Sequence, residues 1–96
     1  MRRSAPKPLG AALSSALERL GIKGKLKRYE VLNLWPRIVG TQIAQVTKAD
    51  HIEGETLFVN VTRSTWRNEL IFLKTELIEK INAAMHEKII KDIIFR

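Results

Sequence analysis

The sequence predicts a single α+β domain with elements in the order ααββαβ and with helices packed on one face of a small three-stranded sheet. Residues 56–62 alternate apolar and polar side chains with a period of two, as in a half-buried strand. Residues 66–81 repeat apolar side chains at intervals of three and four, as along one helix face. With 96 residues, 45% of them hydrophobic, the chain is long enough for one domain with a buried core.

The first segment is predicted to be a flexible basic arm that leads into a short helix. Residues 1–8 are basic and contain two prolines, so the domain itself is expected to span residues 9–96. Apolar side chains recur at helical spacing in Leu9–Leu20, and Gly21 follows where a helix end needs a left-handed residue. This helix buries little area per residue, so we expect it to cover the core as a lightly held lid.

A basic loop is expected to precede the second helix. Residues 21–28 contain two glycines and four cations, which favours a flexible loop that meets phosphates with side chains and backbone N–H groups. Helical periodicity then runs through Leu26–Val46 and across Pro36, which removes one backbone hydrogen bond. Because the apolar stripe keeps its phase across the proline, we predict one kinked helix rather than two segments that meet at Trp35.

The second half of the chain is predicted to hold a hairpin, a long helix and a third strand. Thr47–Ile52 and Thr56–Thr62 flank a Glu-Gly-Glu turn and should pair in antiparallel fashion. Ser64 is expected to cap a helix that runs to about Met85. Ile89–Phe95 is apolar on both faces, and we expect it to form the last strand, at a sheet edge or a docking surface.

The net charge is +7, and most of it lies in the first third of the chain. Residues 1–30 hold eight Lys or Arg and two Glu, a net charge of +6, whereas residues 31–96 have a net charge of +1. A modest positive excess is compatible with a merely solubilising surface. Its clustering favours a surface that binds phosphate groups, as in proteins that bind nucleic acids.

The candidate binding residues are cations of the basic loop, cations at the start of the third helix, and one tryptophan. Trp35 and Trp66 both lie in phase with apolar stripes, so both can be core residues. Trp66 is the better candidate for a base-stacking or partner-binding residue, because two arginines lie beside it. The cations expected to contact the phosphate backbone of a nucleic acid are Lys23, Lys25, Lys27, Arg28, Arg63 and Arg67.

Residue types that carry catalysis or hold metals are not grouped in the sequence. The chain has no cysteine, and His51 and His86 lack the spacing to other ligands or carboxylates that metal sites and acid–base pairs require. It has no glycine-rich nucleotide-binding loop of a known type. We therefore expect a binding protein without enzymatic activity, cofactor, metal or small-molecule substrate.

Membrane insertion and secretion are not expected. No apolar run approaches the roughly 18 residues that span a bilayer. Arg2 and Arg3 precede an apolar stretch, as in a signal peptide, but Pro6 and Pro8 interrupt the pattern. The sequence therefore indicates a cytoplasmic protein.

Four segments together resemble the DciA family. They are L-W-P-R-I-V-G at 34–40, E-G-E-T-L-F-V-N-V at 53–61, S-T-W-R-N-E-L at 64–70 and the terminal I-I-K-D-I-I-F-R. The resemblance covers residues 9–96, and the order and separation of the segments make it specific. It implies a KH-like domain.

The resemblance also implies an accessory factor of bacterial DNA replication that assists loading of the replicative helicase DnaB onto single-stranded DNA, with no ATPase motif. Many relatives carry a long disordered tail implicated in helicase contact, whereas this sequence stops at Arg96, so that contact is expected from the domain or the arm. KH domains clamp nucleic acid with a G-x-x-G loop. Gly21-Ile22-Lys23-Gly24 has that spacing but precedes the second helix.

Two other classes of function stay open. A KH-like protein that binds RNA would have the same fold and the same basic surface. A protein-interaction adaptor would present the basic face to an acidic protein surface and bind no nucleic acid.

Overall fold

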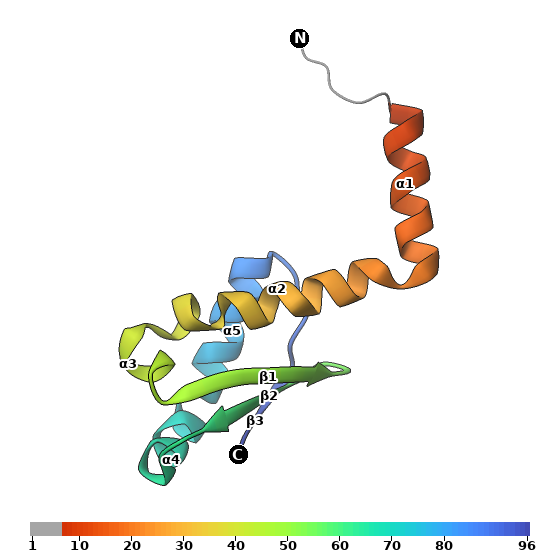
Figure 1. Cartoon of the computed structure of the whole chain (residues 1–96). Coiled ribbons are helices and arrows are strands. Elements are labelled where there is room, and N and C mark those ends of the chain that lie inside the picture. Colours follow the sequence, from red (N-terminus) through yellow and green to blue (C-terminus); the bar gives the residue numbers. More distant parts are fainter. Residues whose placement is uncertain (1–6) are drawn as a thin grey trace.

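The computed structural model describes residues 7–96 and shows an α+β fold in which the elements follow the predicted order (Figure 1). Of the predicted arm, residues 1–6 lie outside the described residues, whereas Lys7 and Pro8 begin the first helix. Two of the predicted helices are each divided in two. In chain order the elements are α1 (Lys7–Leu20), α2 (Ile22–Val39), α3 (Thr41–Ala44), β1 (Thr47–Glu53), β2 (Thr56–Val61), α4 (Ser64–Phe72), α5 (Lys74–Met85) and β3 (Asp92–Phe95).

The strands form one mixed three-stranded sheet in the order β1-β2-β3. β1 and β2 are antiparallel, with Thr47 opposite Val61 and Glu53 opposite Thr56, and β3 runs parallel to β2. A β-bulge at Asp50 shifts the register of β1. The predicted α+β class, the three-stranded sheet and the antiparallel hairpin are confirmed.

The core lies between one face of the sheet and the helices α2, α4 and α5. α2 packs on β1 and α5, α4 contacts β2 and β3, and α5 contacts β3. Because strand side chains alternate between faces, Lys48, Asn60 and Ile94 point to the opposite face, where they are exposed. The fully or nearly buried apolar side chains are Val31, Trp35, Leu57, Val59, Val61, Leu70, Leu77, Ile81, Ile90, Ile93 and Phe95.

The basic loop and the single kinked helix predicted for residues 21–46 were wrong. Residues 22–28 are the first turns of α2, so Gly24 lies inside a helix and not in a G-x-x-G loop. Helix α2 continues past Pro36 and ends at Gly40, where φ is 88° and ψ is 166°. This conformation is nearly exclusive to glycine, and it separates α2 from α3. The apolar periodicity could not reveal this break, because the apolar spacing of α2 continues unchanged into the next helix.

The long helix predicted from Ser64 to Met85 is also divided. Leu73 has φ −91° and ψ 0°, and its N–H is shared between the carbonyls of Glu69 and Leu70, which tightens the turn between α4 and α5. Ser64 is the first residue of α4, not its cap. The capping position belongs to Arg63, which makes no side-chain cap hydrogen bond.

The last strand is shorter than the predicted Ile89–Phe95, because Asn82 forms hydrogen bonds with the backbone of the first two residues of that range. The side-chain oxygen of Asn82 accepts hydrogen bonds from the backbone N–H groups of Ile89 and Ile90, both 3.0 Å long. The Asn82 amide nitrogen donates to the carbonyl of Ile90 over 2.9 Å. Asn82 thus ties the segment to α5, and ladder pairing with β2 begins only at Asp92.

Helix α1 does not form the predicted lid. It contacts α2 but no strand, and it projects away from the rest of the molecule (Figure 1). The radius of gyration of 16.4 Å accordingly exceeds the roughly 12 Å expected for a compact chain of this length. Along α1 and the first half of α2, Leu13, Leu20, Leu26 and Tyr29 each expose more than half of their surface.

Candidate nucleic-acid interface

The four predicted cations of α2 do not form one surface. At 100° per residue, Lys23 and Lys27 share one side of the helix. Lys25 lies about 160° from both around the helix axis, and Arg28 lies about 140° from Lys23 and about 100° from Lys27. The Lys23 ammonium donates a 2.6 Å hydrogen bond to the Ser14 hydroxyl of α1. Lys25 and Arg28 are exposed and make no ion pair within residues 7–96.

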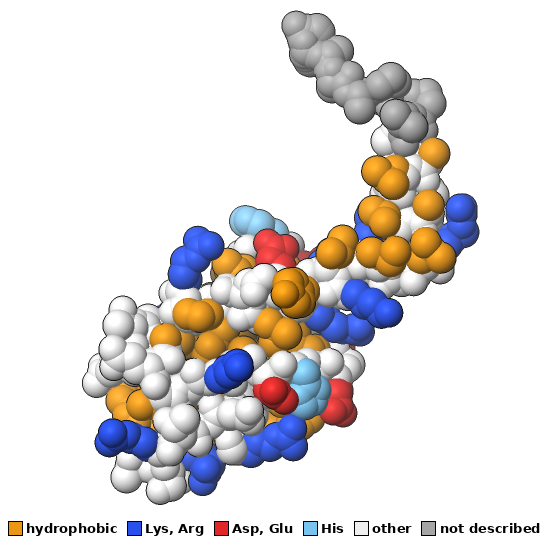
Figure 2. Space-filling model, viewed as in Figure 1, with side chains coloured by type: hydrophobic (Ala, Val, Ile, Leu, Met, Phe, Trp, Pro, Cys, Tyr) orange, Lys and Arg blue, Asp and Glu red, His pale blue; other side chains and the backbone are white. Residues whose placement is uncertain are grey.

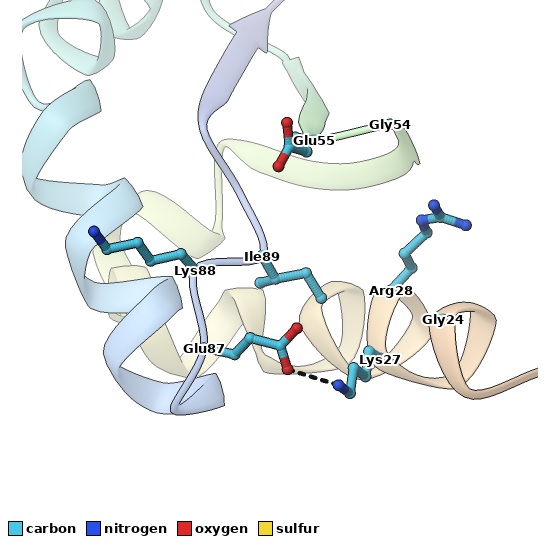
Figure 3. Close-up of a pocket in the computed structure, with 8 residues that line it drawn as sticks. All are labelled: Gly24, Lys27, Arg28, Gly54, Glu55, Glu87, Lys88 and Ile89. Atoms are coloured by element: carbon cyan, nitrogen blue, oxygen red, sulfur yellow. Dashed lines mark hydrogen bonds and ion pairs between the residues drawn. The ribbon is translucent and has the colours of Figure 1, made fainter. Parts of the chain in front are cut away.

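Lys27 and Arg28 flank a shallow pocket of about 270 Å³ between α2, the β1–β2 turn and the segment before β3 (Figure 3). Carboxylates from Glu55 and Glu87 also line this pocket. Lys27 pairs with Glu87 at 2.6 Å, whereas Lys88 points away from that pair (Figure 3). The acidic side chains reduce the attraction of this pocket for phosphate.

Arg63 and Arg67 lie at the opposite end of the hairpin from this pocket. The seven residues of β1 separate the two ends by about 20 Å. The Nε–H of Arg67 is buried and has no acceptor among the described residues. The six predicted cations therefore divide into two groups, one on α2 and one at the base of the hairpin.

Two cations outside the predicted set lie near the base of the hairpin, at the start of β1 and just after β3. Register places Lys48 opposite Asn60, and the backbone of Arg96 bonds to Val59 and Val61 on the other side of β2. Lys48, Asn60 and Arg96 therefore form a row across the open face of the sheet. Lys and Arg side chains gather at this end of the molecule, over β1 and around α4 (Figure 2). We call Lys48, Arg63, Arg67 and Arg96 the hairpin-base cluster.

None of the four cations of the hairpin-base cluster forms an ion pair with a carboxylate of the described chain. The ion pairs of the described chain use other cations, such as Lys74 with Asp92 at 3.1 Å, Lys80 with Glu76 at 3.6 Å and Lys91 with Glu55 at 3.4 Å. An unpaired cation keeps its charge available to an external anion.

The two tryptophans have different environments. Trp35 is 1% exposed, and its indole N–H donates a 2.9 Å hydrogen bond to the Thr47 hydroxyl, so it is a core residue. Trp66 is half-buried and lines a groove of about 400 Å³ at the hairpin base. Gln42, Gln45, Val46, Thr62 and Arg63 complete that groove.

An aromatic pair stands beside the cationic row on the open face of the sheet. The rings of His51 and Phe58 stack at 4.6 Å, and the Arg96 guanidinium lies 4.8 Å from the centre of the Phe58 ring. The His51 ring nitrogens contact Asp50 Oδ2 at 2.7 Å and Glu53 Oε2 at 2.8 Å. The hydrogen bond to Asp50, followed by that to Glu53, raises the pKa of His51 above 6.5. His51 is thus a residue of β1 whose ring is kept in place by hydrogen bonds to two neighbouring carboxylates.

Groups of three or more His, Cys, Asp or Glu that could hold a metal ion do not occur in residues 7–96. Among the helices of that part of the chain, none is both long and apolar enough to cross a membrane.

Comparison with known proteins identifies the family. The model of the family described as "Dna[CI] antecedent, DciA" matches residues 8–95. A UPF0232 protein of Mycobacterium marinum is 30% identical over 80 residues, which are 83% of this chain and 43% of that protein. UPF0232 proteins of Rhodococcus jostii and Mycobacterium tuberculosis are 25% and 26% identical over 88 residues, 92% of this chain and 47% of each relative. The chain thus spans less than half the length of these relatives, and it belongs to the DciA family.

Proposed function

We propose that this protein is a non-enzymatic accessory factor of DNA replication that binds single-stranded DNA and assists loading of the replicative helicase DnaB. The name of the family supports a role beside the helicase. The observation that carries the DNA-binding part is the hairpin-base cluster, whose four cations have no carboxylate partner within the described residues. The chain would act in the cytoplasm, where the bacterial chromosome lies.

The two cationic groups are proposed to contribute differently to DNA binding. At the hairpin base, Arg63 and Arg67 act together with Lys48 and Arg96. On α2, Lys25 and Arg28 carry more of the interaction than Lys23 and Lys27, because those two ammonium groups already bond to Ser14 and Glu87. Phosphate contacts of this kind position a strand without reading its sequence.

The test is a loading assay with circular single-stranded DNA and the replicative helicase. We expect the full chain to increase the amount of helicase bound to the circle, and to bind the helicase itself after nuclease treatment. If the chain binds the helicase but no nucleic acid, it is an adaptor and the DNA-binding part of the proposal fails. If RNA of equal length displaces single-stranded DNA completely at equimolar concentration, the chain is an RNA-binding protein.

A further inference from the structure

The groove at the hairpin base has a lining that differs from that of the pocket beside α2. It combines one indole, two amides, one hydroxyl and one guanidinium, contributed by Trp66, Gln42, Gln45, Thr62 and Arg63. Carboxylates are not among its lining residues, whereas two line the pocket beside α2. Its volume of about 400 Å³ is within the range of pockets that hold small organic groups.

We propose that this groove is a nucleotide pocket in which one base of a single strand stacks on Trp66 and is read by the amides of Gln42 and Gln45. This inference rests on the proposed function, and it adds a site with base selectivity to a contact otherwise made through phosphates.

The chemistry of the lining matches a nucleotide part by part. An indole stacks on the face of any base, because every base is aromatic. Each glutamine amide presents two donors and one acceptor, and no side-chain hydrogen bond within residues 7–96 engages the amide of Gln42 or Gln45. Such an amide pairs in bidentate fashion with N6 and N7 of adenine.

Cations near the groove can contact the phosphates on either side of the stacked base. Arg63 lies at its rim, and Thr62 is two residues from Asn60 in the row that joins Lys48 to Arg96. Two residues of extended chain correspond to roughly 7 Å, so the row begins close to the wall of the groove that Thr62 forms. A strand with one base in the groove can therefore rest its backbone on unpaired cations.

Tryptophan fluorescence provides a direct test, because the chain has only two tryptophans and Trp35 is buried. We expect oligo(dA) to quench the emission of the full chain, and the quenching to disappear in Trp66→Phe. Trp66→Ala should weaken oligo(dA) binding by roughly 5- to 150-fold, the range for loss of one base stack.

Base selectivity is tested by fluorescence anisotropy with oligo(dA) and oligo(dT). We expect oligo(dA) to bind roughly 5- to 150-fold more tightly than oligo(dT), the range for one bidentate amide contact. The double variant Gln42→Ala/Gln45→Ala should lose this preference. Asn68→Ala, which removes an exposed amide of α4 outside the groove, should keep it.

The outcomes separate the two proposals. If the chain binds both oligonucleotides without quenching, or if the double glutamine variant keeps the full preference for oligo(dA), the nucleotide pocket is wrong and the proposed function stands. If no oligonucleotide binds, the proposed function fails and the pocket fails with it.

Discussion

At the scale of single residues, a chain of two hydrogen bonds joins the core to the start of the hairpin. The indole N–H of Trp35 donates to the Thr47 hydroxyl, which donates in turn to the carbonyl of Ile43 over 2.7 Å. Thr47 is the one buried polar residue of the described core. Its hydroxyl satisfies the only polar atom of the Trp35 side chain, and so it fixes α2 against β1.

We expect Thr47→Val to lower the free energy of unfolding by about 1–3 kcal/mol, because the valine leaves the buried indole N–H without an acceptor. Chemical denaturation followed by circular dichroism measures the change. The same substitution at exposed Thr75 in α5 is the control and should change stability far less. Equal losses at both positions would show that the hydrogen bond to Trp35 contributes nothing specific.

The two carboxylates beside His51 predict that the stability of the folded protein depends on pH. Hydrogen bonds to Asp50 and Glu53 raise its pKa in the folded protein, so the protonated ring is favoured by folding. Its contribution to stability is therefore fully present below pH 6.5 and is lost as the pH rises through the raised pKa.

The measurement compares the melting temperatures of the wild type and His51→Gln at several pH values. We expect the wild type to be the more stable protein in mildly acidic buffer, and the difference to shrink as the pH rises. A difference that stays constant with pH would mean that the ring acts only through its stacking on Phe58.

At the scale of elements, Gly40 decides where the second helix ends. Its φ of 88° is strained for any residue with a Cβ, although a Cβ there would meet no atom within 4 Å. We expect Gly40→Ala to destabilise the protein by about 1–3 kcal/mol through backbone strain alone. Gly24→Ala, in the interior of α2 and equally free of contacts, should instead stabilise it by up to about 1 kcal/mol. If thermal denaturation shows both changes with the same sign, strain at Gly40 is not the cause of the helix end.

The spacing of apolar side chains predicted the elements that have one face buried and the other exposed along their length. The alternation of residues 56–62 and the stripe of residues 66–81 identified β2, α4 and α5, because burial selects apolar side chains at a fixed spacing. The breaks at Gly40 and Leu73 were not predicted, since the apolar phase continues across both. The length of β3 was not predicted either, because Asn82 acts from a different element.

At the scale of the whole molecule, the interface depends on strand pairing that no local pattern reveals. Arg63, Arg67 and Trp66 could be selected because they are close in sequence. Lys48 and Arg96 are 48 residues apart, and only the pairing of β1 and β3 with β2 brings them to one row. The clustering of Lys23, Lys25, Lys27 and Arg28 in the sequence was misleading, because a helix distributes neighbouring side chains around its axis.

The most direct test of the DNA-binding surface is the salt dependence of affinity for single-stranded DNA in a pair of charge-matched variants. Lys48→Ala/Arg63→Ala/Arg96→Ala removes unpaired cations, whereas Lys74→Ala/Lys80→Ala/Lys91→Ala removes the same charge from cations that pair with Asp92, Glu76 and Glu55. Between about 50 and 200 mM salt, the logarithm of the affinity falls in proportion to the number of phosphates that the protein neutralises.

We expect the first variant to lower this slope by about 2, at roughly 0.7 for each lost contact, and the second variant to leave it nearly unchanged. Equal slopes in the two variants, or an affinity of the wild type that does not change with salt, would contradict binding through the hairpin-base cluster.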